Sequence, residues 1–206
     1  MKKHMLSIGN NQKLNKKIAV FNTLCKKTCP GRTSYCERVC YAQKSERQYP
    51  DARAMRTRNT KAITGSNFVR DMIKEIQSHK KLYAIRVFES GDYNSQQAID
   101  NWFEIARAFP QLVFLSYTKS FMYDFSQKPD NFSILFSIDA TTTLKLPNYT
   151  WNRFAYTVAD LEAIPSGYVH TCNKMSATGT VDKHYCGTTC FKCWHNAIKN
   201  IYFLEH

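Results

Sequence analysis

Short apolar runs alternate along this chain with segments whose apolar residues recur at helical spacing. Four near-continuous apolar runs are typical of strands buried on both faces, and we expect them at 17–21, 82–88, 112–117 and 132–138. Helical periodicity predicts helices at about 51–62, 67–79 and 95–108, with a short helix near 119–125. Weaker strands are expected at 153–158 and 167–171, and the last 20 residues are expected to be helical.

This alternation of strand and helix is typical of the α/β class. Strands that are apolar throughout predict a parallel sheet joined by right-handed crossovers. The pattern leaves two architectures open, an open doubly wound sheet and an incomplete (β/α) barrel. We find no internal repeat and no low-complexity segment.

Polar residues gather directly after the predicted strands. The clearest cases are Cys25 and Cys29 after the first strand, the segment 89–93 after the second and 117–119 after the third. Further examples are Asp139, Asp160, His170 and Cys172. Because the carboxyl ends of parallel strands share one edge of the sheet, we expect these residues to converge on one site.

The composition is that of a globular chain, and its charge is unevenly distributed. Hydrophobic residues make up 43%, no run of 18 apolar residues suggests a membrane span, and no signal peptide is evident. We therefore expect a cytoplasmic protein, in the host cytoplasm if a phage encodes it. Residues 1–80 carry 18 Lys and Arg against 5 Asp and Glu, which accounts for the whole net charge of +13. This basic segment favours an anionic partner such as nucleic acid, or else is a solvated surface.

The eight cysteines form two groups. The first group comprises Cys25, Cys29, Cys36 and Cys40, and the second comprises Cys172, Cys186, Cys190 and Cys193. In a cytoplasmic chain such groups indicate metal ligands more than disulfides. Structural zinc usually takes paired two-residue gaps, and only the gap from Cys190 to Cys193 has that length. The spacing therefore favours one or two [4Fe-4S] clusters over zinc, which stays an alternative.

Several motifs together resemble the gene product 88 family of phage proteins. They are Thr28-Cys29-Pro30-Gly31, Cys36-x3-Cys40-Tyr41-Ala42, Ser90-Gly91-Asp92, Tyr117-Thr118-Lys119 and the terminal Cys186, Cys190 and Cys193-Trp194. The resemblance implies a partial (β/α) barrel similar to radical S-adenosylmethionine (radical SAM) enzymes. On this view residues 1–171 form the core with the cluster loop 25–40, and 172–206 form a cysteine-rich extension with an auxiliary cluster.

The same resemblance suggests roles for individual residues. Cys29, Cys36 and Cys40 would hold a [4Fe-4S] cluster with one open iron that binds S-adenosylmethionine, leaving Cys25 spare or as a fourth ligand. The candidates for contacting that small-molecule cofactor are Glu89, Ser90, Gly91, Asp92, Tyr117 and Lys119. The loop lacks the C-x3-C-x2-C spacing of radical SAM enzymes, which appears instead at Cys186, Cys190 and Cys193.

Other functions are compatible with the same residues. The chain could be a non-catalytic iron–sulfur or zinc protein with a basic face that binds nucleic acid, acting on host machinery. Arg53, Arg56, Arg58 and Lys61 form a basic helical patch, which we expect to be a solvated face. The sequence identifies no catalytic residue, substrate or oligomeric state.

Overall fold

The computed structural model describes residues 4–158, 186–196 and 198–204. Within these ranges the strands form one seven-stranded sheet in the order β1-β2-β3-β4-β5-β6-β7. The strands are β1 Leu6–Ile8, β2 Ile18–Phe21, β3 Ala84–Val87, β4 Val113–Thr118, β5 Phe132–Ile138, β6 Phe154–Val158 and β7 Asn200–Leu204. The helices are α1 Ser34–Arg38, α2 Tyr41–Gln48, α3 Pro50–Ala62, α4 Phe68–Ser78 and α5 Gln96–Ala108.

The sheet is mostly parallel and open. Strand β1 runs antiparallel to β2, and every neighbouring pair from β2 to β7 is parallel. Each strand lies beside the next one in the chain, so the order contains no reversal of the kind that defines a doubly wound sheet. Strands β1 and β7 are the two edges and do not pair, so the sheet does not close. The predicted parallel α/β sheet is therefore confirmed at this level.

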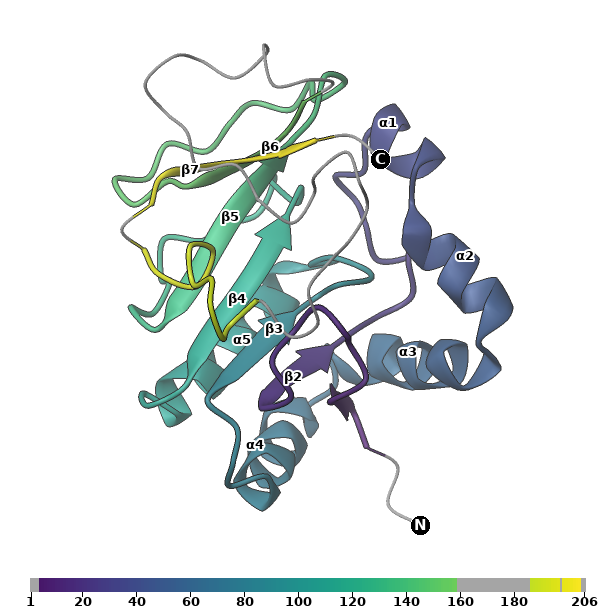
Figure 1. The fold of residues 1–206 in the computed structure, drawn as a ribbon, viewed down its shortest axis with the longest axis vertical. Coiled ribbons are helices and arrows are strands. Elements are labelled where there is room, and N and C mark those ends of the chain that lie inside the picture. Colours follow the sequence, from purple (N-terminus) through teal and green to yellow (C-terminus); the bar gives the residue numbers. More distant parts are fainter. Residues whose placement is uncertain (1–3, 159–185, 197, 205–206) are drawn as a thin grey trace.

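One face of the sheet packs against helices. Alternate strand residues such as Phe21, Val87 and Phe114 contact the apolar faces of α4 and α5 in a single buried cluster. Trp102 of α5 lies near its centre, with its ring in edge-to-face contact with that of Phe21 at 5.0 Å. In Figure 1 these two helices lie behind the strands.

The opposite face is covered by the C-terminal segment. The intervening strand residues, among them Val20, Leu115 and Leu135, form a second cluster with Trp194 and Ile201. Figure 1 shows this segment, in yellow, crossing in front of the strands before it enters β7. The described parts of residues 172–206 thus pack on the core and contribute its last strand.

Two predicted helices are wrong, and both errors have a local cause. At 119–125 the chain makes turns, because Thr118 Oγ1 accepts from the Ser120 amide and Ser120 Oγ donates to the Tyr93 carbonyl. Near the C-terminus, Asn200–Leu204 pairs with β6 as a strand in place of the expected helix. The expected strand at 167–171 lies outside the described residues.

The other predicted strands and helices are present within a few residues of their expected ends. Three short elements were not predicted: β1, α1 and α2. No helix in the described ranges has the length and apolar character needed to cross a bilayer.

Candidate metal centre at the carboxyl edge of the sheet

The first cysteine group lies on the loop that leaves β2, at the carboxyl edge of the parallel strands. Thr33 caps α1, its Oγ1 accepting from the Cys36 amide at 3.1 Å. Helix α1 is only five residues long, and Cys40 follows it as the N-cap of α2. Cys36 and Cys40, four residues apart in the chain, are therefore each held by a short helix.

The four thiols of this loop lie close to one another. Cys40 is in electrostatic contact with each of Cys25, Cys29 and Cys36, and all four are free thiols. Burial raises the pKa of Cys25 and of Cys29 to about 12 and also raises that of Cys36. Such thiols stay protonated at neutral pH unless a metal replaces their protons.

The spacing of the sulfurs bears on the kind of metal that the loop can hold. No three of these four sulfurs all lie within 4.8 Å of one another. A tetrahedral zinc ion with bonds of about 2.3 Å places its sulfurs about 3.8 Å apart. An iron–sulfur cluster binds each thiolate on a different iron, so its ligands stand further apart. The four sulfurs are therefore not gathered for a single ion in this structure, and an all-thiol donor set is chemically compatible with a cluster.

Cys25 has surroundings unlike those of the other three cysteines. Its amide donates to Glu46 Oε1 at 2.9 Å, and its thiol also bonds to that carboxylate. Arg56 Nη1 lies 3.3 Å from the same oxygen, and both side chains are largely buried. The expectation that Arg56 belongs to a solvated face was wrong, because its guanidinium is the counterion of a buried glutamate. Arg53 and Lys61 are exposed as expected.

Asp92 is in electrostatic contact with Cys29, and its hydrogen bonds connect the segment after β3 to the end of β4. Its carboxylate accepts from Thr118 Oγ1 at 2.7 Å and from the amides of Lys119 and Tyr93, each at 2.8 Å. Burial raises the pKa of this carboxyl to about 6 despite those hydrogen bonds, and its charge raises the pKa of Cys29. Asp92 thus uses three hydrogen bonds to hold the edge of the sheet together.

A buried ion pair lies beside Cys36. Lys119 Nζ, at the end of β4, is 2.8 Å from Asp139 Oδ2, at the end of β5, and Thr33 Oγ1 donates to the same oxygen at 2.6 Å. The Lys119 ammonium opposes the rise in the pKa of Cys36 that burial causes. A positive charge next to the thiols favours a bound thiolate at this position.

Two glycines let the loop approach the strand ends. A Cβ added at Gly31 would collide with the Lys119 carbonyl oxygen, and one at Gly91 would collide with Thr23 Oγ1. Gly91 also has a φ of 82°, which favours glycine. Both loops therefore lie on neighbouring backbone or side chains with no room for a side chain of their own.

The remaining predicted cofactor contacts lie in two places. Ser90 Oγ donates to the Thr23 carbonyl at 2.9 Å and contacts Glu46, so it helps to hold the start of the first cysteine loop in place. Glu89 pairs with Arg86 at 3.1 Å, and the Arg86 guanidinium lies 5.4 Å from the centre of the Tyr117 ring. Glu89 and Tyr117 are therefore gathered around Arg86, whereas Asp92 and Lys119 lie next to the first cysteine group.

The described part of the second cysteine group lies on the face opposite α4 and α5. Cys186 and Cys193 pack against the second apolar cluster, and the Cys193 carbonyl accepts from Ser133 Oγ at 2.6 Å. Cys193 is also in electrostatic contact with Arg86. Cys186 and Cys190 pair through a single backbone bridge. Cys172, the fourth member, lies outside the described residues, as do Asp160 and His170.

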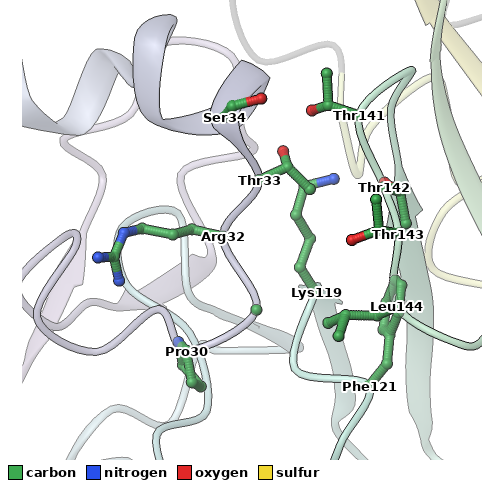
Figure 2. A pocket seen from close by; sticks show the side chains of 11 residues that line it. Pro30, Arg32, Thr33, Ser34, Lys119, Phe121, Thr141, Thr142, Thr143 and Leu144 are labelled. Carbon is green, nitrogen blue, oxygen red and sulfur yellow. The ribbon is translucent and has the colours of Figure 1, made fainter.

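A cavity of about 360 Å³ opens beside the first cysteine loop. Figure 2 shows the Lys119 side chain running along it toward Thr33, with threonine hydroxyls on the facing loop. Its lining comes from the cysteine loop, the end of β4 and the segment after β5: Pro30, Gly31, Arg32, Thr33, Ser34, Lys119, Phe121, Thr141, Thr142, Thr143 and Leu144. Apolar and polar groups both line the cavity. Its Lys119 ammonium is paired with Asp139, and the Arg32 guanidinium donates to the carbonyl oxygens of Lys26 and Cys29.

Several residues of this site were not foreseen from the sequence. Glu46, Thr23, Thr28 and Thr33 hold the cysteine loop in place, yet each is an ordinary polar residue in a polar stretch. Glu46 lies on α2, which was itself missed. Of these, only Thr33 carried a usable signal, because a threonine directly before a helix is a common N-cap.

Fold and site together define an α/β protein with an open parallel sheet and a cysteine-rich centre at its carboxyl edge. The model of the family described as Gene product 88 matches residues 2–196, and the chain belongs to that family. It is 26% identical over 125 residues to the Gene 88 protein of Mycobacterium phage L5 and, equally, to that of Mycobacterium phage D29. The match covers 54% of this chain and 52% of each relative, so the chain spans about half their length. No solved structure matches it.

Proposed function

We propose that this protein holds a [4Fe-4S] cluster through Cys29, Cys36 and Cys40 and acts as a radical SAM-like enzyme in the cytoplasm of the infected host. The observation that carries the proposal is the convergence of the loop thiols directly after the first parallel strand, at a spacing wider than a single ion needs. Supporting it, strands β2 to β7 run parallel in sequential order, as in a partial (β/α) barrel.

The fourth cysteine of the loop fits a role outside the cluster. Cys25 donates its thiol hydrogen bond to Glu46, and that carboxylate is held by Arg56. A thiolate at this position would lose that hydrogen bond and face the Glu46 carboxylate directly. Cys29 has no such hydrogen bond to Asp92, and Cys36 faces the Lys119 ammonium. Three-cysteine ligation leaves one iron without a protein ligand, where the cofactor would bind. When bound, such a cluster supplies the electron that cleaves S-adenosylmethionine.

The chain's own residues would bind and orient the cofactor. The cavity beside the loop places Lys119 near threonine hydroxyls, a combination that suits the carboxylate and hydroxyl groups of S-adenosylmethionine. The Lys119 ammonium is positioned by Asp139, which prevents it from swinging into the thiols. Asp92 and Gly91 keep the second strand end close to Cys29.

Reconstitution with cofactor tests this proposal. We expect the anaerobically loaded, reduced protein to change its electron paramagnetic resonance signal when S-adenosylmethionine is added, and to cleave it to methionine and 5′-deoxyadenosine. The Lys119→Met variant should keep its iron and bind the cofactor more weakly. Cys190→Ser, in the second group, is the matched control and should retain binding. If the electron paramagnetic resonance signal of the loaded protein does not change when the cofactor is added, the radical SAM assignment is refuted, while the cluster itself is not.

A second candidate function follows from the charge of residues 1–80, which carry the whole net charge of +13. In this alternative the metal centre, with iron or with zinc, is structural, and residues 1–80 bind nucleic acid. Binding to DNA or RNA whose affinity falls steeply between 50 and 200 mM salt would support it. Weak binding without a salt slope would argue against it.

A further inference from the structure

At a distance along the chain from every cysteine, two imidazoles and a carboxylate come together. Glu75 and His79 stand four residues apart at the end of α4, so they share one face of that helix. His4 reaches them from the residues just before β1. One ligand atom from each of these side chains lies within 4.8 Å of the others, and among the described residues no other such group of three is found.

The carboxylate of this cluster is buried, although the imidazoles are accessible. The side chain of Glu75 is 7% exposed and that of His4 is 58% exposed. Glu75 accepts from the amides of Met5 and Leu6 at 3.0 Å, which fixes its orientation. A carboxylate has about four lone-pair positions, so acceptor capacity is left over.

The charge of Glu75 lacks a fixed counterion. In the described chain no lysine or arginine pairs with it, and the side chain at ion-pair distance is the imidazole of His4, whose Nδ1 lies 3.4 Å from Oε1. Buried carboxylates are costly unless they are paired or bind a metal. The ring centres of His4 and His79 are 5.9 Å apart, so both imidazoles face the same space.

We propose that His4, Glu75 and His79 form a second kind of metal site, for a divalent first-row cation such as Zn²⁺. Two imidazoles and one carboxylate are a common ligand set for zinc, with bonds of about 2.0–2.2 Å, and water completes the tetrahedron. Ligands on such bonds stand within about 4 Å of one another, so the present spread needs only a small closure. The site does not depend on the proposed cluster or its chemistry.

The bound ion would fasten the edge of the sheet. Strand β1 is three residues long and pairs only with β2 among the described strands. Its hydrogen bonds to α4 run through Glu75, whereas Asn59 of α3 donates to the Met5 carbonyl just before the strand. A cation shared by His4 and the two helix residues joins β1 directly to α4. Because it binds only the folded chain, it stabilises the fold in proportion to the logarithm of its concentration.

Cobalt substitution tests the site on the full chain with its thiols already loaded with iron and sulfide. We expect one further Co²⁺ to bind per chain and to give visible d–d bands without a thiolate-to-cobalt charge-transfer band. His79→Gln should weaken binding by more than the roughly 10–100-fold that loss of an outer-shell partner costs. His195→Gln removes an imidazole outside the cluster and should bind cobalt as the wild type does.

A structural readout accompanies the spectrum. Zn²⁺ should raise the melting temperature of the wild type and of His195→Gln, and slow hydrogen exchange at the Leu6 amide. It should do neither in His79→Gln, whose circular dichroism should match the wild type because His79 lies at the end of α4. Equal cobalt binding by His79→Gln and the wild type, a thiolate charge-transfer band, or no binding at micromolar metal would each overturn the proposal.

Discussion

Lys119 and Asp139 join the ends of two neighbouring strands through a buried ion pair in which Nζ lies 2.8 Å from Oδ2. The pair stands between Cys36 and the cavity beside the cysteine loop. Thr33 of that loop donates to the same carboxylate, so one aspartate links β4, β5 and the cysteine loop. This contact connects the sheet to the proposed metal centre.

The pair predicts a pH dependence of stability in the metal-free chain. Hydrogen bonds from Lys119 and Thr33 overcome the opposing effect of burial and lower the pKa of Asp139 from 3.8 to about 2. A lowered carboxyl pKa contributes stability that is present above the unfolded value and is lost as pH falls from about 4 through 2. We expect a contribution of about 2 kcal/mol.

Denaturant unfolding at several pH values measures this contribution. Asp139→Asn should flatten the stability profile between pH 4 and 2, and Asp130→Asn serves as a control because that side chain is exposed. Parallel profiles for the wild type and Asp139→Asn would mean that the pair contributes nothing to folding.

The close approach of Gly31 to the Lys119 backbone predicts a specific effect of substitution. Gly31→Ala forces the loop away from the end of β4, because the new Cβ would collide with a carbonyl oxygen that cannot move independently. We expect lower thermal stability and a reduced iron content after reconstitution. Gly65→Ala is the control, since a Cβ added there would lie 3.1 Å from its nearest neighbour, the Ala62 carbonyl oxygen, and away from the loop. Equal iron in the two variants would show that the loop tolerates the shift.

The buried pair of Arg56 and Glu46 predicts a large cost of truncation. Arg56→Met leaves the Glu46 carboxylate buried without its counterion, and removing one partner of such a pair typically costs about 3–5 kcal/mol. Arg53→Met, on the exposed side of the same helix, should cost less than about 0.5 kcal/mol. Urea unfolding of both variants gives the comparison, and similar values would disprove the structural role of Arg56.

The environment of Cys25 predicts that the four loop cysteines are not equivalent. Cys25→Ser keeps a hydroxyl that can donate to Glu46, so its iron and sulfide content should stay near that of the wild type. Cys29→Ser removes a proposed ligand and should lose most of the iron and sulfide that the loop cluster contributes. Loss of iron in both variants to the same extent would make Cys25 a fourth ligand, and the open iron would then be absent.

The sequence predicted the sheet well because its strands are apolar on both faces. The strand Phe132–Ile138 has the same first and last residues as predicted, since a run of this kind suits a strand buried on both faces. The error at 119–125 came from side-chain bonds of Thr118 and Ser120 that compete with a helix. The strand Asn200–Leu204 depends on an edge of β6 that is formed by distant residues.

The metal centre was only partly predictable. Spacing alone grouped Cys25 to Cys40, and the strand-end rule placed Asp92, Lys119 and Asp139 near them. Neither rule separates Cys25 from its neighbours, because that difference comes from Glu46 on an unpredicted helix. Tyr117 and Glu89 illustrate the converse, since the strand-end rule includes them but the pleat directs them toward Arg86.

The central claim is that the loop cysteines hold iron and sulfide. The most direct test is quantitation of iron, acid-labile sulfide and zinc in anaerobically reconstituted protein, alongside a variant in which Cys29, Cys36 and Cys40 are all serine. Because the second cysteine group can hold its own cluster, the difference between the two proteins is the informative quantity. We predict that the wild type holds about four more iron and four more sulfide per chain than the variant, as one [4Fe-4S] cluster requires. Equal iron in the two proteins, or zinc without sulfide in the wild type, would contradict the account.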